Sequence, residues 1–178
     1  MTRRSVLAAG TLAATLVPGK PRAAEPAGLP ALHVVTPPKP LPAVKFRDAA
    51  GKIQTLAAYR GRGVVLNLWA TWCAPCVREL PSLDALAGQL KGGHIAVLTV
   101  SADIGGVKTV REFYAKHHID NLPVLVDPEG DVLHALGARG LPTTYLVTPA
   151  GTEAGWIEGG QDWSAPASLA RIKALIGG

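Results

Sequence analysis

The chain of 178 residues contains only two cysteines, Cys73 and Cys76, and this scarcity limits what they can do. A structural zinc site needs four ligands, and the five histidines are scattered along the chain, so we expect no metal centre. Haem attachment needs a histidine directly after the second cysteine, where Val77 stands instead. A static disulfide across two residues closes so small a loop that it gains little closure entropy. Reversible dithiol–disulfide exchange is the interpretation that we favour.

The N-terminal region lacks an apolar run long enough to span a bilayer. Ser5–Val17 is apolar over 13 residues and follows Arg3 and Arg4, which is the organisation of an export signal rather than of a membrane helix. We expect residues 1–24 to be this signal, either a twin-arginine signal or an ordinary secretory one. We expect it to be cleaved after Ala24 or Gly19, with a retained N-terminal anchor as the alternative. Export would place the remainder in the periplasm, where disulfides persist.

Acidic residues are absent before Glu25, and this explains most of the formal charge of +5. Without residues 1–24 the chain has 14 basic and 13 acidic residues. The basic character therefore belongs to the leader, and no basic stripe indicates a nucleic-acid partner.

Proline is concentrated early in the chain, with eight of the 15 prolines at or before Pro42. Such a segment favours extended polyproline conformations. We therefore predict a proline-rich linker over residues 25–43 and one globular domain over residues 44–178.

Strand-like and helix-like segments alternate through the rest of the chain, without internal repeats. Short segments at 44–47 and 53–56 flank a turn and predict a hairpin. Further strands are expected at 64–69, 94–101, 123–127, 143–147 and 152–157, and helices at about 74–90, 107–118, 132–136 and 164–176. This order predicts an α/β domain that closes with an antiparallel hairpin.

The cysteine pair stands between a buried strand and a helix, so the first sulfur is expected near a helix N-terminus. The free N–H groups and the dipole there stabilise a thiolate, which can lower a thiol pKa from about 8.5 to roughly 3.5–7.5. We expect Cys73 to be the nucleophile and Cys76, one turn further, to be the resolving thiol.

Three segments carry a family resemblance, which spans residue 44 to the end of the chain. Asn67–Cys76 followed by Glu79-Leu80-Pro81, the segment Gly140–Val147, and Phe46–Leu56 resemble the TlpA/ResA-like branch of the thioredoxin superfamily. Asn67 stands where ordinary cytosolic thioredoxins carry a buried aspartate, which favours this exported branch. The resemblance implies a thioredoxin fold, a central mixed β-sheet flanked by helices, with a small N-terminal β-hairpin. It implies no cofactor beyond a redox-active disulfide.

The resemblance also implies the site residues around the two cysteines. Pro142 is expected to follow a cis peptide bond and to pack against the cysteine pair, while Leu141 offers backbone groups to an extended substrate. Glu79 is expected to tune a thiol pKa or to relay a proton, the alternative being a solvated first-turn glutamate. Trp72 and Pro75 are assigned to the surface that partners contact. The position of Asn67 and Trp69 on the buried strand predicts that Asn67 is buried and hydrogen-bonded and that Trp69 is a core residue. Trp156 and Trp163 are expected to be packing residues.

The predicted function is an exported thiol–disulfide oxidoreductase, a reductase of particular partner disulfides. Similar proteins reduce apocytochrome cysteines before haem attachment or copper-chaperone cysteines, and they take electrons from a membrane thiol carrier. Three alternatives stay open: a disulfide oxidase or isomerase, a thiol peroxidase, for which Thr71 is the only support in the sequence, and a module that binds Cu(I) through both thiolates. We expect a monomer.

Overall fold

The computed structural model of the chain describes residues 28–177. The predicted export signal, residues 1–24, and the first three residues of the predicted linker lie outside this range. Within the described residues, no helix is both long and apolar enough to cross a membrane.

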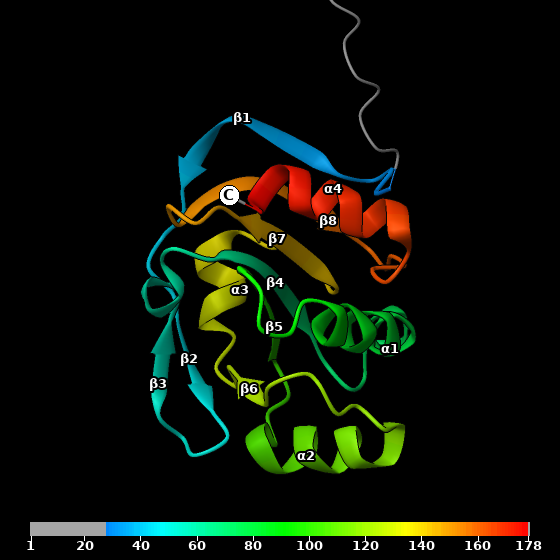
Figure 1. The fold of residues 1–178 in the computed structure, drawn as a ribbon. Coiled ribbons are helices and arrows are strands. Elements are labelled where there is room, and N and C mark those ends of the chain that lie inside the picture. Colours follow the sequence, from blue (N-terminus) through cyan, green and yellow to red (C-terminus); the bar gives the residue numbers. More distant parts are fainter. Residues whose placement is uncertain (1–27, 178) are drawn as a thin grey trace, which may run out of the picture.

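A single eight-stranded mixed sheet forms the centre of the domain (Figure 1). The spatial order of its strands is β1-β8-β7-β4-β5-β6-β2-β3. β4, β5 and β6 run parallel, while β7 is antiparallel to both β4 and β8. The strand bounds are β1 His33–Pro40, β2 Lys45–Asp48, β3 Ile53–Thr55, β4 Gly63–Trp69, β5 Ile95–Ser101, β6 Leu125–Val126, β7 Thr143–Val147 and β8 Thr152–Glu158.

Helices cover both faces of this sheet, as the predicted α/β class requires. α1 (Ala74–Gln89) and α4 (Pro166–Ile176) pack on one face, and the short α3 (Asp131–Leu136) packs on the other (Figure 1). α2 (Gly106–His117) adds Val110 and Tyr114 to the same core cluster as α1 and α4. A 3₁₀ helix, Leu56–Tyr59, follows β3. The thioredoxin fold is confirmed.

The hairpin of β2 and β3 lies at one edge of the sheet. Lys45 pairs with Thr55 across the hairpin, and Arg47 pairs with Val126 of β6. Its turn is closed by the Asp48 carboxylate, which accepts bonds from the N–H groups of Ala50 and Lys52. The hairpin thus extends the sheet beyond its parallel strands.

The prediction of a linker over residues 25–43 is wrong for residues 28–43. His33–Pro40 forms strand β1, which pairs antiparallel with β8 at the other edge of the sheet. Leu29 is buried in the main core cluster. Proline lacks an N–H but is tolerated in an edge strand, where one side of the backbone needs no partner. The globular domain therefore begins before residue 44.

The central strand β4 positions the cysteine pair. All seven of its residues are buried, which is the reason for its nearly continuous apolar sequence. Trp69, near its carboxyl end, is a core residue as expected and stacks on Tyr114 with ring centroids 5.8 Å apart. The chain leaves β4 through a short loop and enters α1, so Cys73 lies at the carboxyl edge of the sheet.

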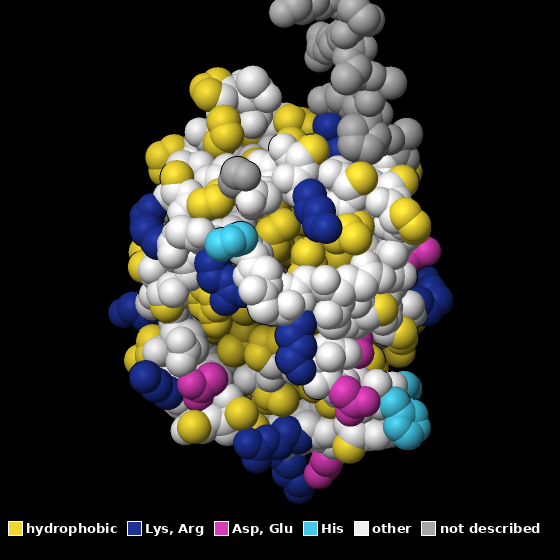
Figure 2. Space-filling model, viewed as in Figure 1, with side chains coloured by type: hydrophobic (Ala, Val, Ile, Leu, Met, Phe, Trp, Pro, Cys, Tyr) yellow, Lys and Arg dark blue, Asp and Glu magenta, His cyan; other side chains and the backbone are white. Residues whose placement is uncertain are grey.

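The surface seen in the view of Figure 1 carries mixed side chains. Figure 2 shows lysine and arginine side chains dispersed over this face, with hydrophobic side chains visible between them. One hollow of about 370 Å³ is lined by Leu90 and Ile95 together with Lys91 and Lys173. It lies at the carboxyl ends of α1 and α4, away from the cysteine pair.

Candidate active site

Cys73 and Cys76 form a disulfide at the N-terminus of α1. The S–S distance is 2.10 Å and the Cα atoms are 5.3 Å apart. Cys73 is the N-cap of the helix, and its Sγ accepts a hydrogen bond from the N–H of Cys76 at 3.3 Å. Cys73 retains 6% exposure, whereas Cys76 has none. The sulfur of Cys73 is therefore the one that a partner can reach, and a thiolate on it would face the positive end of the helix dipole.

Glu79 lies one turn beyond Cys76 and is buried. Its Oε1 accepts a bond from Asn67 Nδ2 at 2.8 Å, and its Oε2 accepts bonds from the N–H of Gln161 and from Trp163 Nε1, both at 3.0 Å. The alternative of a solvated glutamate is wrong. Burial raises the pKa of the Glu79 carboxyl, and the three hydrogen bonds oppose that shift.

A surface pocket of about 370 Å³ is lined in part by Glu79. Its lining includes Pro75 between the two cysteines, Glu79, and Gly160. A Cβ atom at Gly160 would lie 3.4 Å from the Pro75 carbonyl oxygen and 3.8 Å from Glu79 Oε2. A small side chain at position 160 would therefore make ordinary van der Waals contacts with Pro75 and with the carboxyl.

Asn67 connects Glu79 to the next strand. Its Nδ2 donates both to Glu79 Oε1 and to Thr144 Oγ1 on β7, each at 2.8 Å. The expectation of a buried, hydrogen-bonded Asn67 is confirmed. The roles of Thr144, Gln161 and Trp163 were missed, and Trp163 is more than a packing residue because it holds Glu79.

A second group of polar residues fixes the loop before Cys73. The Asp103 carboxylate accepts bonds from the N–H of Thr71 at 2.9 Å, from Thr71 Oγ1 at 2.6 Å, and from Ser101 Oγ at 2.7 Å. Asp103 was not singled out from the sequence, although an acidic residue just after a buried strand was the available signal. The Thr71 hydroxyl is engaged with Asp103, which weakens the thiol-peroxidase alternative that relied on it.

The segment around Pro142 lies beside the end of β4. The Leu141–Pro142 peptide bond is cis, as predicted. Thr143 pairs with Leu68 of β4, so Pro142 stands next to the start of the cysteine loop. Among the described residues, no hydrogen bond uses the N–H or the C=O of Leu141. Both groups are thus available to a partner.

Trp72, directly before Cys73, is 71% exposed. A large apolar side chain in such a position adds contact area for a partner without supporting the core. Within residues 28–177, no group of three or more histidine, cysteine or acidic residues is arranged to hold a metal ion.

The mixed sheet and the disulfide at the N-terminus of α1 define a thioredoxin-fold protein whose two cysteines are separated by two residues. The chain belongs to the AhpC/TSA family, which it matches over residues 37–152. It is 36% identical over 104 residues to the thiol-disulfide oxidoreductase ResA of Geobacillus thermodenitrificans, covering 58% of this chain and 59% of the relative. It is 31% identical over 123 residues to ResA of Bacillus thuringiensis subsp. konkukian, covering 69% and 70%. The resemblance to the ResA-like branch is confirmed.

Solved structures agree with this assignment. The exposed lipoprotein thioredoxin Etrx1 of Streptococcus pneumoniae superimposes with a TM-score of 0.64 at 31% identity, covering 75% of this chain and 100% of that chain. A putative DsbE from Chlorobium tepidum has a TM-score of 0.68 at 24% identity, covering 78% and 96%, and supports the fold alone. The match to the Geobacillus relative spans less than two thirds of that protein's length.

Proposed function

We propose that the protein is an exported thiol–disulfide oxidoreductase that reduces disulfides in particular partner proteins. The observation that carries this proposal is the Cys73–Cys76 disulfide at the N-terminus of α1, in which Cys73 is the only member with any exposure, 6%, and Glu79 is buried one turn further along the helix. The ResA relatives, which are named thiol-disulfide oxidoreductases, support it. Etrx1 is named an exposed lipoprotein, which supports a location outside the cytoplasm.

In the first step the Cys73 thiolate attacks one sulfur of a partner disulfide. The partner's S–S bond breaks, its second sulfur leaves as a thiolate that takes up a proton, and a mixed disulfide joins Cys73 to the partner. The N-terminus of α1 favours the attacking thiolate because its N–H groups and dipole stabilise negative charge.

In the second step the Cys76 thiol loses its proton and attacks Cys73 Sγ. The mixed disulfide breaks, the partner leaves as a thiolate that takes up a proton, and the Cys73–Cys76 disulfide forms. Two electrons have then passed from this protein to the partner. Cys76 is buried and its proton needs an acceptor nearby; Glu79, one turn away with a pKa raised by burial, is suited to that task. A membrane thiol carrier would return the protein to its dithiol form.

The partner's backbone would pair with Leu141. The unused N–H and C=O of this residue offer an extended segment one donor and one acceptor beside the cysteine loop. Trp72 and Pro75 would provide apolar contact next to the reacting sulfur. These contacts fit a polypeptide better than a small disulfide. The candidate partners are exported proteins with oxidised cysteine pairs, of the cytochrome-maturation or copper-site-assembly kind.

Two measurements test the proposal. The Cys76→Ser variant should accumulate a mixed disulfide with a disulfide-containing peptide, and Cys73→Ser should not. The reduction potential of the pair, measured in dithiothreitol or glutathione buffers, should lie near or below about −220 mV, on the side of thioredoxin and glutaredoxin. A potential near about −120 mV would instead identify an oxidant of newly exported dithiols.

A further inference from the structure

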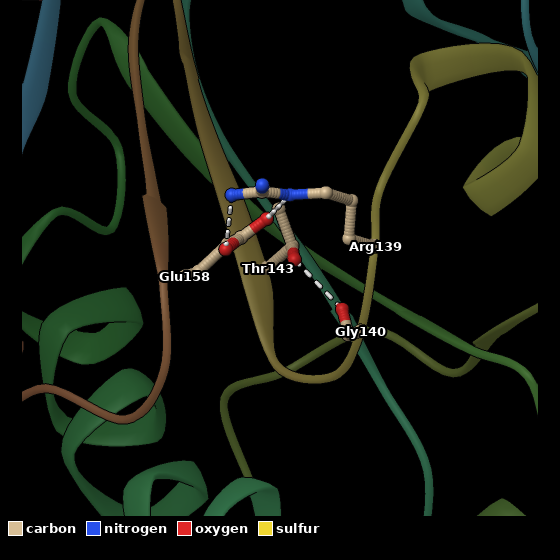
Figure 3. Close-up of polar contacts among 4 residues, drawn as sticks. All are labelled: Arg139, Gly140, Thr143 and Glu158. Carbon is tan, nitrogen blue, oxygen red and sulfur yellow. Dashed lines mark hydrogen bonds and ion pairs between the residues drawn. The ribbon is translucent and has the colours of Figure 1, made fainter.

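The loop that carries Pro142 is closed by an ion pair with the end of β8. Arg139 Nε donates to Glu158 Oε1 at 3.0 Å, and Arg139 Nη2 donates to Glu158 Oε2 at 2.9 Å (Figure 3). The planar guanidinium thus meets the carboxylate through two parallel bonds, an arrangement that fixes direction as well as distance. Arg139 lies two residues before Leu141, in the connection between α3 and β7.

Two further bonds hold the same loop. Thr143 Oγ1 donates to the Gly140 carbonyl at 2.7 Å, as Figure 3 also shows. The N–H of Gly159 donates to the Pro142 carbonyl at 2.9 Å. The residues on both sides of Leu141 are therefore held by hydrogen bonds. Among the described residues, the N–H and C=O of Leu141 itself make none.

The ion pair is poorly placed to stabilise the fold. The Arg139 side chain is 75% exposed and that of Glu158 is 36% exposed, and exposed pairs contribute little to stability. The other ion pair on β8 differs in this respect, since Lys39 meets a Glu153 side chain that is only 4% exposed. β8 thus carries a buried carboxylate near its start and an exposed bidentate pair at its end.

We propose that Arg139 and Glu158 are positioning residues that hold Leu141 ready for the backbone of a partner polypeptide. This inference rests on the proposed function, because it requires that partners pair with Leu141. An ordered loop spares the complex the entropy of fixing Leu141 at the moment of binding. The benefit applies to an extended polypeptide and not to a small disulfide, which needs only Cys73.

The test compares two substrates with the reduced full-length protein. One is an uncharged ten-residue peptide with an internal disulfide, and the other is 2-hydroxyethyl disulfide, which has no charge and no peptide backbone. The quantity of interest is the ratio of the two second-order rate constants. Arg139→Ala should lower this ratio by up to about fivefold, the scale of an exposed ion pair. The peptide carries no charge, so direct attraction to Arg139 does not contribute.

Three further variants separate positioning from other effects. Arg139→Glu places two carboxylates together and should lower the ratio further, while the reversed pair Arg139→Glu with Glu158→Arg should restore it. Arg139→Lys keeps the positive charge but lacks the two parallel N–H donors of the guanidinium, so its ratio should lie between those of the wild type and Arg139→Ala. The Cys73–Cys76 reduction potential should stay the same in all of them.

Lys39→Ala is the matched control, because it breaks the ion pair at the other end of the same strand. It leaves the buried Glu153 carboxylate without Lys39 and should lower the melting temperature more than Arg139→Ala does. It should leave the ratio unchanged. The positioning role would be overturned if Arg139→Ala left the ratio unchanged, whether or not both rate constants fell. It would also be overturned if the reversed pair failed to restore the ratio. A wild-type protein that reduces neither substrate would overturn the proposed function first, and this inference with it.

Discussion

The indole N–H of Trp163 donates a hydrogen bond to Oε2 of Glu79 at 3.0 Å, across 84 residues of sequence. The same carboxyl accepts from Gln161 and from Asn67. Three parts of the chain thus converge on one buried group beside the cysteine pair: β4, α1 and the segment before α4.

Replacing Trp163 with phenylalanine should keep an aromatic ring in the core but remove the N–H donor together with part of the packed volume. The Glu79 carboxyl would lose one of its three partners while still buried, which we expect to cost about 1.5–3 kcal/mol in the free energy of unfolding. Urea unfolding at neutral pH measures this change. Trp156→Phe is the control, since Trp156 stacks on His33 at the surface edge of the sheet and is only partly buried. Equal losses in the two variants would contradict a specific role for the Trp163 N–H.

Glu79 should make stability fall as pH rises. Its pKa is raised above the ordinary value of 4.5 by burial, so the folded state binds the proton more tightly than the unfolded state does. The resulting stability is fully present below pH 4.5 and is lost as pH rises through the folded-state pKa. The difference in unfolding free energy between wild type and Glu79→Gln, measured across this window, isolates the contribution. A difference that does not change with pH would show that the carboxyl titrates alike in both states.

Glu79→Gln should also slow the resolution of mixed disulfides. A glutamine cannot accept the Cys76 proton, and loss of a general base typically slows a step by about 10²–10⁴-fold. Stopped-flow measurement of partner release, after the mixed disulfide has formed, tests this step. The initial attack by Cys73 should change much less, because the thiolate of Cys73 is stabilised by the N-terminus of α1 and does not need Glu79 to take its proton. Slowing of both steps by the same factor would point to disturbance of the whole site.

The loop before Cys73 should depend on the Thr71 hydroxyl. Thr71→Val preserves the shape of the side chain but leaves the buried Asp103 without its 2.6 Å bond. We expect a loss of about 1.5–3 kcal/mol in unfolding free energy, the scale for a bond to a charged group. Thr148→Val removes the hydroxyl contact with Thr152 in the β7–β8 turn and should cost less. A larger loss at Thr148 would contradict the importance assigned to Asp103.

The segment before residue 44 should contribute to stability. Leu29→Ala deletes a side chain from the main core cluster and should cost about 2–5 kcal/mol. Val34→Ala, on the exposed part of β1, should stay within about 0.5 kcal/mol of wild type. Urea unfolding of both variants provides the measurement. If Leu29→Ala left the free energy of unfolding unchanged, the segment would be a linker and not part of the folded domain.

Much of the fold follows from periodicity in the sequence. The apolar run of β4 and the helical spacing after Cys76 placed the cysteine pair at a strand–helix junction, and the structure has it there. The cis bond before Pro142 was implied only by family resemblance, because a sequence alone gives a low prior for any cis proline. β1 was missed because its prolines favour a linker, and only the partner strand β8 reveals that they occupy an edge.

The buried polar network was harder to foresee than the fold. Asn67 and Glu79 were identified because they lie within the family segment around the cysteines. Trp163 and Asp103 reach the site by contacts across 84 and 32 residues of sequence, and no local pattern encodes such contacts. Which donor meets a buried carboxyl is decided by how the elements pack.

The two ends of the described chain lie at opposite ends of the sheet. Gly28 accepts a bond from Ser168 Oγ, which also donates to the carbonyl of Asp162, a residue that lines the Glu79 pocket. The carbonyl of Ile176 lies instead against Gly63, at the start of β4. A dye, bead or fusion partner joined before residue 28 would therefore begin beside the Glu79 pocket and would screen that pocket from large partners. Joined at the C-terminal end, it would leave the cysteine pair clear.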